Sequence, residues 1–196
     1  GSNDARAGFL DDVDGMERAI KALKHTTTKI KPPAANGKTE FEAAVKAAIT
    51  DGCKNVLLYI ASHGSKESVT MGSGSYTAAD MKKLIEANPT VTFKVVIQAC
   101  KSGSWVEPLK DKVEIIETAT DSTKSSYSAD PDTASDPNPA DKGSEFTSGL
   151  VEDLELIPNS PVAQIFIQQC MMGFPPLISG KPPLVCQLEW AYRSAV

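Results

Sequence analysis

Two short apolar runs dominate the pattern of hydrophobic and polar positions, and both end in residues that can carry chemistry. Residues 55–62 read NVLLYIAS and residues 93–97 read FKVVI, which is typical of buried strands. The first run leads into His63-Gly64 and the second into Ala99-Cys100. A lone cysteine is usually a small buried hydrophobe. Open α/β sheets, however, carry their ligand sites at the carboxyl ends of strands, so we expect His63 and Cys100 to meet there.

Apolar residues at helical spacing predict helices between the strands. The segment 11–24 opens with acidic residues, which favour the positive end of a helix. Thr39-x-x-Glu42 is a capping-box pattern, Thr77 and Asp80 open another helix, and 72–76 (GSGSY) predicts a turn or short hairpin. The expected helices cover residues 11–24, 39–51, 77–88, 144 onward and 162–172. The expected strands are 26–30, 55–62, 92–99, 113–119 and 183–188.

The alternation of strands and helices predicts a three-layer α/β sandwich with a central, mainly parallel sheet. We expect a single domain over residues 1–196, with a large part at about 1–120 and a small part at 145–196. The polar, proline-containing segment 121–144 links them. A linker of this length and composition is typical of an exposed, mobile segment, and we expect it to act as a processing or gating loop.

Composition excludes several other classes of protein. The net charge is −5 and no basic run occurs, so we expect no nucleic-acid partner. No apolar stretch has the length of a membrane helix, and we expect no membrane partner. The four cysteines lack metal spacing and His25 and His63 are the only histidines, so we expect neither a metal nor another cofactor. The sequence leaves the cellular compartment unknown.

The residues at the two strand ends resemble a known family. YIASHGS at 59–65 and QACKSGS at 98–104 resemble the two catalytic blocks of the caspase-like (clan CD) cysteine peptidases. The closest resemblance is to legumain, whose blocks read His-Gly-Ser and Glu-Ala-Cys-Glu-Ser-Gly-Ser. TATDSTKSSY at 118–127 resembles the legumain segment whose Ser-Ser-Tyr lines the substrate groove. The spacing between His63 and Cys100 (100 − 63 = 37) is shorter than the roughly fifty of caspases.

The resemblance implies a role for each matching residue. Cys100 is the implied nucleophile and His63 the acid and base. The backbone N–H groups of Gly64 and Cys100 are the implied oxyanion hole. The implied substrate-binding residues are Gln98 in the specificity pocket and Ser125, Ser126 and Tyr127 along the groove.

Departures from legumain bear on specificity. Ser62 replaces an aspartate, and Gln98 replaces a glutamate, so the asparagine preference of legumain cannot be transferred. Asp121 and Asp130 follow the strand at 113–119, on the same sheet edge as Gln98, and are further candidates for substrate binding. Acidic groups there favour Arg, Lys or Asn before the scissile bond.

The sequence predicts a cysteine endopeptidase that acts on a peptide or protein through a Cys-His dyad and a thioester acyl-enzyme. A transpeptidase or ligase of the same chemistry is an alternative, because it differs only in whether water or an amine resolves the thioester. An inactive caspase-fold binding module is a second alternative, although both His63 and Cys100 are present. A nucleotide-binding α/β protein is disfavoured, since no phosphate-loop motif occurs.

A further expectation concerns the sheet. Caspase-like sheets have six strands, and the first in sequence lies in the middle, whereas residues 1–10 contain no β-branched apolar run. We therefore expect a separate N-terminal segment to supply a central strand. Direct pairing between 26–30 and 55–62 would contradict this expectation.

Overall fold

The computed structural model describes residues 2–30, 36–127 and 143–156. Gly1–Glu155 forms one compact unit and Leu156–Val196 a second. The helices and strands given below lie in the first unit, apart from Leu156 at the end of the last helix. The helices are α1 Ser2–Ala22, α2 Gly37–Thr50, α3 Ala78–Glu86, α4 Val106–Leu109 and α5 Glu145–Leu156, with the 3-10 helix η1 over Ser102–Trp105. The strands are β1 Asn55–Ala61, β2 Gly64–Ser65, β3 Ser68–Met71, β4 Gly74–Thr77, β5 Thr92–Gln98 and β6 Ile115–Thr118.

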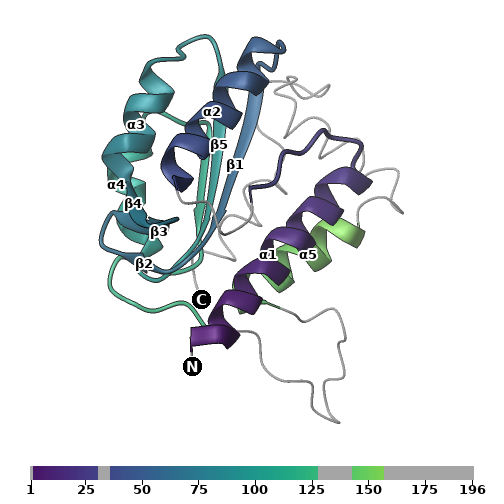
Figure 1. The fold of residues 1–196 in the computed structure, drawn as a ribbon, viewed down its shortest axis with the longest axis vertical. Helices are drawn as coiled ribbons and strands as arrows, with labels where there is room; N and C mark the ends of the chain where they lie inside the picture. The colour runs from purple at the N-terminus through teal and green to yellow at the C-terminus, as the bar shows by residue number, and fades with distance from the viewer. Residues whose placement is uncertain (1, 31–35, 128–142, 157–196) are drawn as a thin grey trace, which may run out of the picture. The chain divides into compact units, whose positions relative to one another are not determined.

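A parallel sheet in the order β1-β5-β6 lies at the centre (Figure 1). The strand β5 is in the middle because its side chains are buried on both faces, from Phe93 through Gln98. Its register with β1 runs from Asn55 opposite Thr92 to Ala61 opposite Gln98. The predictions of strands at 55–62, 92–99 and 113–119 are therefore confirmed, as is the mainly parallel α/β sheet.

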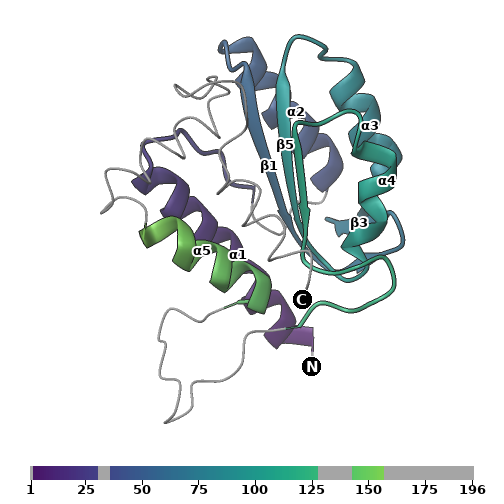
Figure 2. The same cartoon turned by 180° about the vertical axis from the view of Figure 1, so that it is seen from behind.

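Helices α2, α3 and α4 cover one face of the sheet (Figures 1 and 2). Phe93, Val95 and Ile97 alternate along β5 onto this face and join a single apolar core with residues of the three helices. The helical members of that core are Val45, Ala78, Met81, Ile85 and Leu109. Each of the larger of these side chains contributes roughly 1.5–3 kcal/mol relative to exposure, so this core stabilises the packing of the three helices on the sheet.

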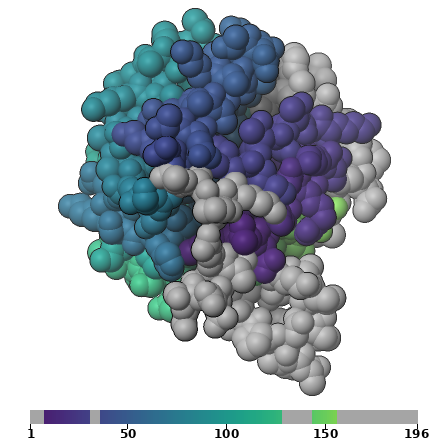
Figure 3. Space-filling view, in the orientation of Figure 1, coloured from purple at the N-terminus to yellow at the C-terminus, as the bar shows by residue number. Residues whose placement is uncertain are grey.

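Helices α1 and α5 lie side by side on the opposite face of the sheet (Figures 1 and 2). Tyr59 of β1 reaches this layer, where its hydroxyl lies 2.6 Å from Oγ1 of Thr147 in α5. Gly15 of α1 allows close contact with Val151, since a Cβ there would lie 3.3 Å from a methyl of the valine. In the space-filling view, the atoms of α2 and α3 occupy one side of the face shown and those of α1 the other (Figure 3).

A small antiparallel sheet, β2-β3-β4, follows the end of β1. The GSGSY segment at 72–76 forms the turn between β3 and β4 and the first three residues of β4, so the predicted hairpin is confirmed. Helix α3 then begins at a complete capping box, in which Thr77 accepts from the N–H of Asp80 and Asp80 accepts from the N–H of Thr77. This box confirms the helix start predicted at Thr77.

Three local predictions are wrong. Helix α1 begins at Ser2 and not near residue 11, in keeping with the helix-forming Ala5-Arg6-Ala7 before the apolar residues. Residues 26–30 form no strand, because this segment bonds to α1: Lys29 pairs with Asp14 and Glu17. Helix α2 has Asn36 at its N-cap and no side-chain cap, so Thr39 and Glu42 form no capping box.

Several predictions lie outside the described residues, namely the helix at 162–172, the strand at 183–188 and most of the 121–144 segment. Within the described part, β1 pairs with β5 on one side and no strand lies on its other side. The segment 26–30 does not pair with β1, so the arrangement that would contradict an intervening strand is not found. A strand supplied by a separate segment stays a prediction.

Candidate active site

The pairing of β1 with β5 brings His63 and Cys100 to one edge of the sheet. Ala61 and Gln98 are the last paired residues, and each candidate residue follows its strand by two positions. The N–H of Ser62 donates to the carbonyl of Gln98 at 3.0 Å, which continues the pairing one residue further. The two sequence blocks therefore leave the sheet together, as the sequence predicts.

Gly64 lies directly against the main chain of Cys100. A Cβ built on Gly64 would stand 2.4 Å from the carbonyl oxygen and 3.2 Å from the nitrogen of Cys100, and 2.8 Å from the Cβ of Ala99. Distances this short leave no room for a side chain. The glycine is thus required by the close approach of two main chains, one from each block.

His63 has a fixed main chain and an exposed side chain. Its carbonyl accepts from the N–H of Thr70 at 2.9 Å, which ties the loop to β3. The hydroxyl of Ser62 donates to the carbonyl of Thr70 at 2.6 Å and reinforces the same turn. The imidazole lies edge-to-face with the ring of Phe9, with ring centroids 4.9 Å apart. Phe9 was missed by sequence reasoning, because α1 was expected to begin after it.

Cys100 is half-buried, with its sulfur 4.0 Å from the carbonyl oxygen of Ser126. Within the described part of the chain, its N–H donates to no acceptor. The next residue, Lys101, has a positive φ of 58° and its N–H donates to the carbonyl of Lys124 at 2.8 Å. The chain therefore turns sharply after the cysteine and leaves the Cys100 N–H beside Gly64.

The three small residues after the cysteine hold the Cys100 loop in place: Ser102, Gly103 and Ser104. The hydroxyl of buried Ser102 accepts from the N–H of Thr120 at 3.2 Å, and that of Ser104 accepts from the N–H of Glu67 at 2.7 Å. A Cβ on Gly103 would lie 2.7 Å from the carbonyl of Thr120. The Cys100 loop is thereby locked to the segment after β6 and to the turn after His63. Sequence reasoning missed these contacts, since their only signal was the small size of the residues.

Gln98 is buried beneath the segment that the sequence assigned to the substrate groove. Its Nε2 donates to the hydroxyl of Ser126 at 2.7 Å, while its Oε1 has no hydrogen-bond donor among the described residues. Ser126 is half-buried, Ser125 is exposed, and Tyr127 is 74% exposed. Gln98, Ser126 and Cys100 are thus brought together, and Ser125 and Tyr127 flank them along the chain.

Of the two acidic candidates for substrate binding, Asp121 lies in the part of the chain that the structure describes. The Oδ1 of Asp121 accepts from the N–H and the hydroxyl of Thr123, each at 2.7 Å, and from the N–H of Lys124 at 2.9 Å. These bonds hold the pKa of Asp121 well below its usual range. Its Oδ2 lies 3.2 Å from the ammonium of Lys124. Asp130 lies outside the described residues.

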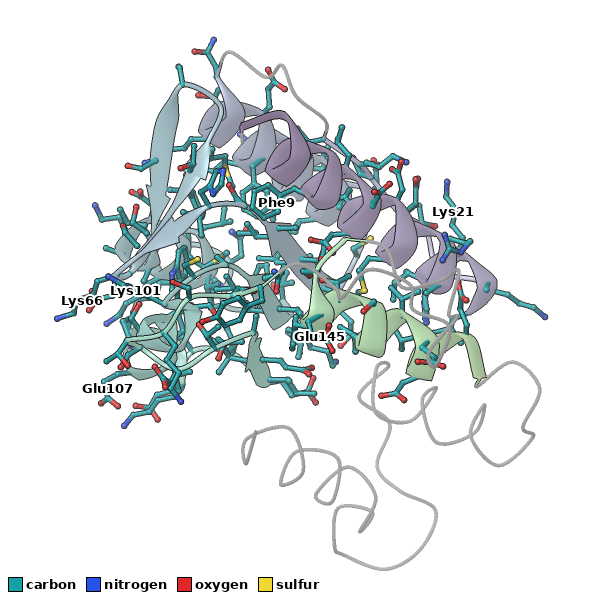
Figure 4. All side chains as sticks on the ribbon, turned by 90° about the horizontal axis from the view of Figure 1, so that it is seen from below. Phe9, Lys21, Lys66, Lys101, Glu107 and Glu145 are labelled. Carbon is teal, nitrogen blue, oxygen red and sulfur yellow. The ribbon has the colours of Figure 1, made fainter. Side chains whose placement is uncertain are left out.

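A shallow cavity of about 330 Å³ lies beside the Cys100 loop. The lining residues come from the turn after His63, from η1 and α4, and from the segment after β6: Lys66, Glu67, Gly103, Ser104, Val106, Glu107 and Ser122. Lys66, Lys101 and Glu107 gather on the same side of the molecule, away from Lys21 (Figure 4). The lining of this cavity therefore carries charges of both signs, from Lys66, Glu67 and Glu107.

Fold and site together define the class. A central parallel sheet between helical layers, with His-Gly and Ala-Cys at the ends of adjacent strands, is the arrangement of a caspase-like peptidase of clan CD. The model of the Peptidase C13 family matches residues 34–150, which include both blocks, and the chain belongs to this family.

A curated relative points to the same class. The chain is 30% identical over 196 aligned positions to Caspase-1-B of Xenopus laevis. The match covers 83% of this chain and 50% of the caspase, so the chain spans about half the length of that relative. A greater closeness to legumain than to the caspases stays a prediction.

Among the residues that the structure describes, no helix has the length and apolar character needed to cross a bilayer.

Proposed function

We propose that the protein is a cysteine endopeptidase in which Cys100 is the nucleophile and His63 the acid and base. The observation that carries the proposal is the contact between the two blocks, in which Gly64 lies so close to Cys100 that no side chain fits. Membership of the Peptidase C13 family supports the same chemistry. A thiol needs a neighbouring base or positive charge to become reactive at neutral pH, and His63 is the candidate at this sheet edge.

In the proposed reaction, His63 takes the proton of Cys100 and the sulfur attacks the carbonyl carbon of the scissile bond. The carbonyl oxygen gains the charge, and in this proposal the N–H groups of Cys100 and Gly64 donate to it. The C–N bond then breaks as His63 protonates the leaving amine, which leaves a thioester. Water, deprotonated by His63, attacks the thioester and releases a carboxylic acid and the thiol.

We propose that Gln98 selects the residue before the scissile bond. Among the described residues its Oε1 is an acceptor without a donor, two residues before the candidate nucleophile, and a buried acceptor gains most from a donor that arrives with the substrate. Arg, Lys and Asn side chains offer such donors, whereas Asp offers none at neutral pH. Ser126 accepts a hydrogen bond from the amide nitrogen of Gln98, and Tyr127 is exposed and is proposed to border the substrate groove.

The same thioester supports a transpeptidase if an amine replaces water. No contact in the described residues favours one acceptor over the other, so the endopeptidase is the proposal and the ligase is an outcome of its test. An added peptide amine that appears in the product would identify transpeptidation.

The test is a peptide-library cleavage screen with the wild type, Cys100→Ala and His63→Ala. We expect cleavage by the wild type, and losses of roughly a thousandfold or more in both variants. Circular dichroism and thermal unfolding should match the wild type, because neither side chain fills the core. Cys53→Ser is the matched control, since this exposed thiol lies before β1, at the opposite end of that strand from His63. Unchanged cleavage by either site variant would reject the proposed dyad.

A further inference from the structure

The imidazole of His63 has an aromatic neighbour and no hydrogen-bond partner among the described residues. Phe9, on α1, meets it edge-to-face at a centroid distance of 4.9 Å. Figure 4 shows Phe9 on the side of α1 that faces the strands. Phe9 is half-buried, so the ring is part of the packing and also reaches the site.

The chemistry proposed for His63 requires a defined ring orientation. A catalytic base is usually oriented by a third group that accepts a hydrogen bond from its second nitrogen. Here the main chain of His63 is held by Thr70, but the side-chain torsion that turns an imidazole is broad and roughly two-fold. An exposed ring without a partner would sample several orientations, and few of them serve the thiol.

We propose that Phe9 is a positioning residue that holds the imidazole of His63 in the orientation in which it exchanges a proton with Cys100. The proposal rests on the proposed function of His63 and names a residue of α1 as part of the same site. An edge-to-face pair at this distance favours one tilt of the imidazole over others, because the edge of one ring meets the electron-rich face of its partner.

Helix α1 is a rigid support for this contact. Met16, Ala19 and Ile20 are buried on its inner face. Buried Asp12 accepts from the N–H of Ser144 at 2.7 Å and from its hydroxyl at 2.9 Å, which ties α1 to the start of α5. Phe9 lies one helical turn before Asp12, so the ring that meets His63 projects from an anchored part of the helix.

The experiment measures how fast iodoacetamide alkylates Cys100 at neutral pH, with peptide mass spectrometry as the readout and exposed Cys53 as the internal reference. It needs no known substrate. We expect His63→Ala to slow alkylation of Cys100 about tenfold or more, because the base is lost. Phe9→Ala should slow it about three- to tenfold, the range that an aromatic pair supports. In the His63→Ala background, Phe9→Ala should change the rate less than about twofold, since it acts through His63.

Two controls separate positioning from general stability. Phe9→Tyr keeps the ring and should restore most of the rate. Phe41→Ala removes a comparable edge-to-face pair, with Tyr76 at 5.2 Å on the other face of the sheet, and should leave the alkylation of Cys100 unchanged. Thermal unfolding of every variant identifies any that fails to fold.

Each outcome has a separate meaning. If alkylation of Cys100 is slow in His63→Ala but keeps its wild-type rate in Phe9→Ala, the role of Phe9 is overturned and the proposed function stays intact. Equal slowing by Phe9→Ala in both backgrounds also overturns positioning, because the effect then bypasses His63. An unchanged rate in His63→Ala contradicts the proposed function itself.

Discussion

Gly64 and Cys100 are in main-chain contact: a Cβ on the glycine would stand 2.4 Å from the cysteine carbonyl oxygen. This contact joins the two sequence blocks at the point where the candidate oxyanion hole would form. It also explains why a residue without a side chain must follow His63.

Gly64→Ala should therefore push the two loops apart. We expect a loss of about 1–3 kcal/mol in the free energy of unfolding and a fall of about a hundredfold or more in kcat/KM. Gly74→Ala is the matched control, because nothing lies within 4 Å of a Cβ built there. Urea unfolding and peptide cleavage measure the two effects. Full activity in Gly64→Ala would mean that the contact is not needed for catalysis.

Gln98→Glu should alter the preference before the scissile bond. A carboxylate in this buried position attracts a cationic side chain, so we expect the ratio of kcat/KM for Arg or Lys over Asn to rise about tenfold. Asp121→Asn tests an acidic candidate for substrate binding. We expect a smaller change in the same kcat/KM ratio, because three donors of its own turn already bind that carboxylate. Preferred cleavage after Asp by the wild type would contradict the role assigned to Gln98.

Asp12 should make stability fall as pH rises. Burial raises its pKa to about 6, against the opposing hydrogen bonds from Ser144. The carboxyl is neutral below about pH 4 in both folded and unfolded chains. The stability that the folded chain has with a neutral Asp12 is lost as pH rises through 6. For a buried carboxyl this amounts to about 3 kcal/mol by pH 7.

Asp12→Asn removes the titrating group and keeps an acceptor for Ser144. We expect the variant to gain stability relative to the wild type between pH 4 and pH 7, measured by urea unfolding at several pH values. Asp11→Asn, on the exposed side of the same helix, is the control for the loss of a negative charge. A difference that does not change with pH would show that Asp12 is ionised in the folded protein throughout this range.

The two capping-box patterns should respond differently to mutation. Thr77→Ala removes an acceptor for the N–H of Asp80 at the start of α3, and we expect a loss of about 1 kcal/mol in the free energy of unfolding. Thr39→Ala lies inside α2, where no side-chain cap forms, and we expect a change within about 0.5 kcal/mol. Chemical denaturation measures both, and equal losses would contradict the cap assignment.

The sequence by itself determined the central strands and the order of their neighbouring helices. Three consecutive β-branched residues, as at 95–97, have few alternatives to a buried strand, and helical spacing in 77–88 has few alternatives to a helix. The placement of His63 and Cys100 at one edge of the sheet followed as well, because parallel strands end at the same sheet edge.

The tertiary structure decided the contacts between residues distant in sequence. Asp12, expected at a helix start, lies within α1 and bonds to Ser144, 132 residues away. Residues 26–30 have strand propensity, but Lys29 pairs with two carboxylates on α1, and the segment joins neither of the sheets described. Phe9 meets His63 for the same reason: packing chooses the partners of a side chain, and local pattern carries no information about residues brought near by the fold.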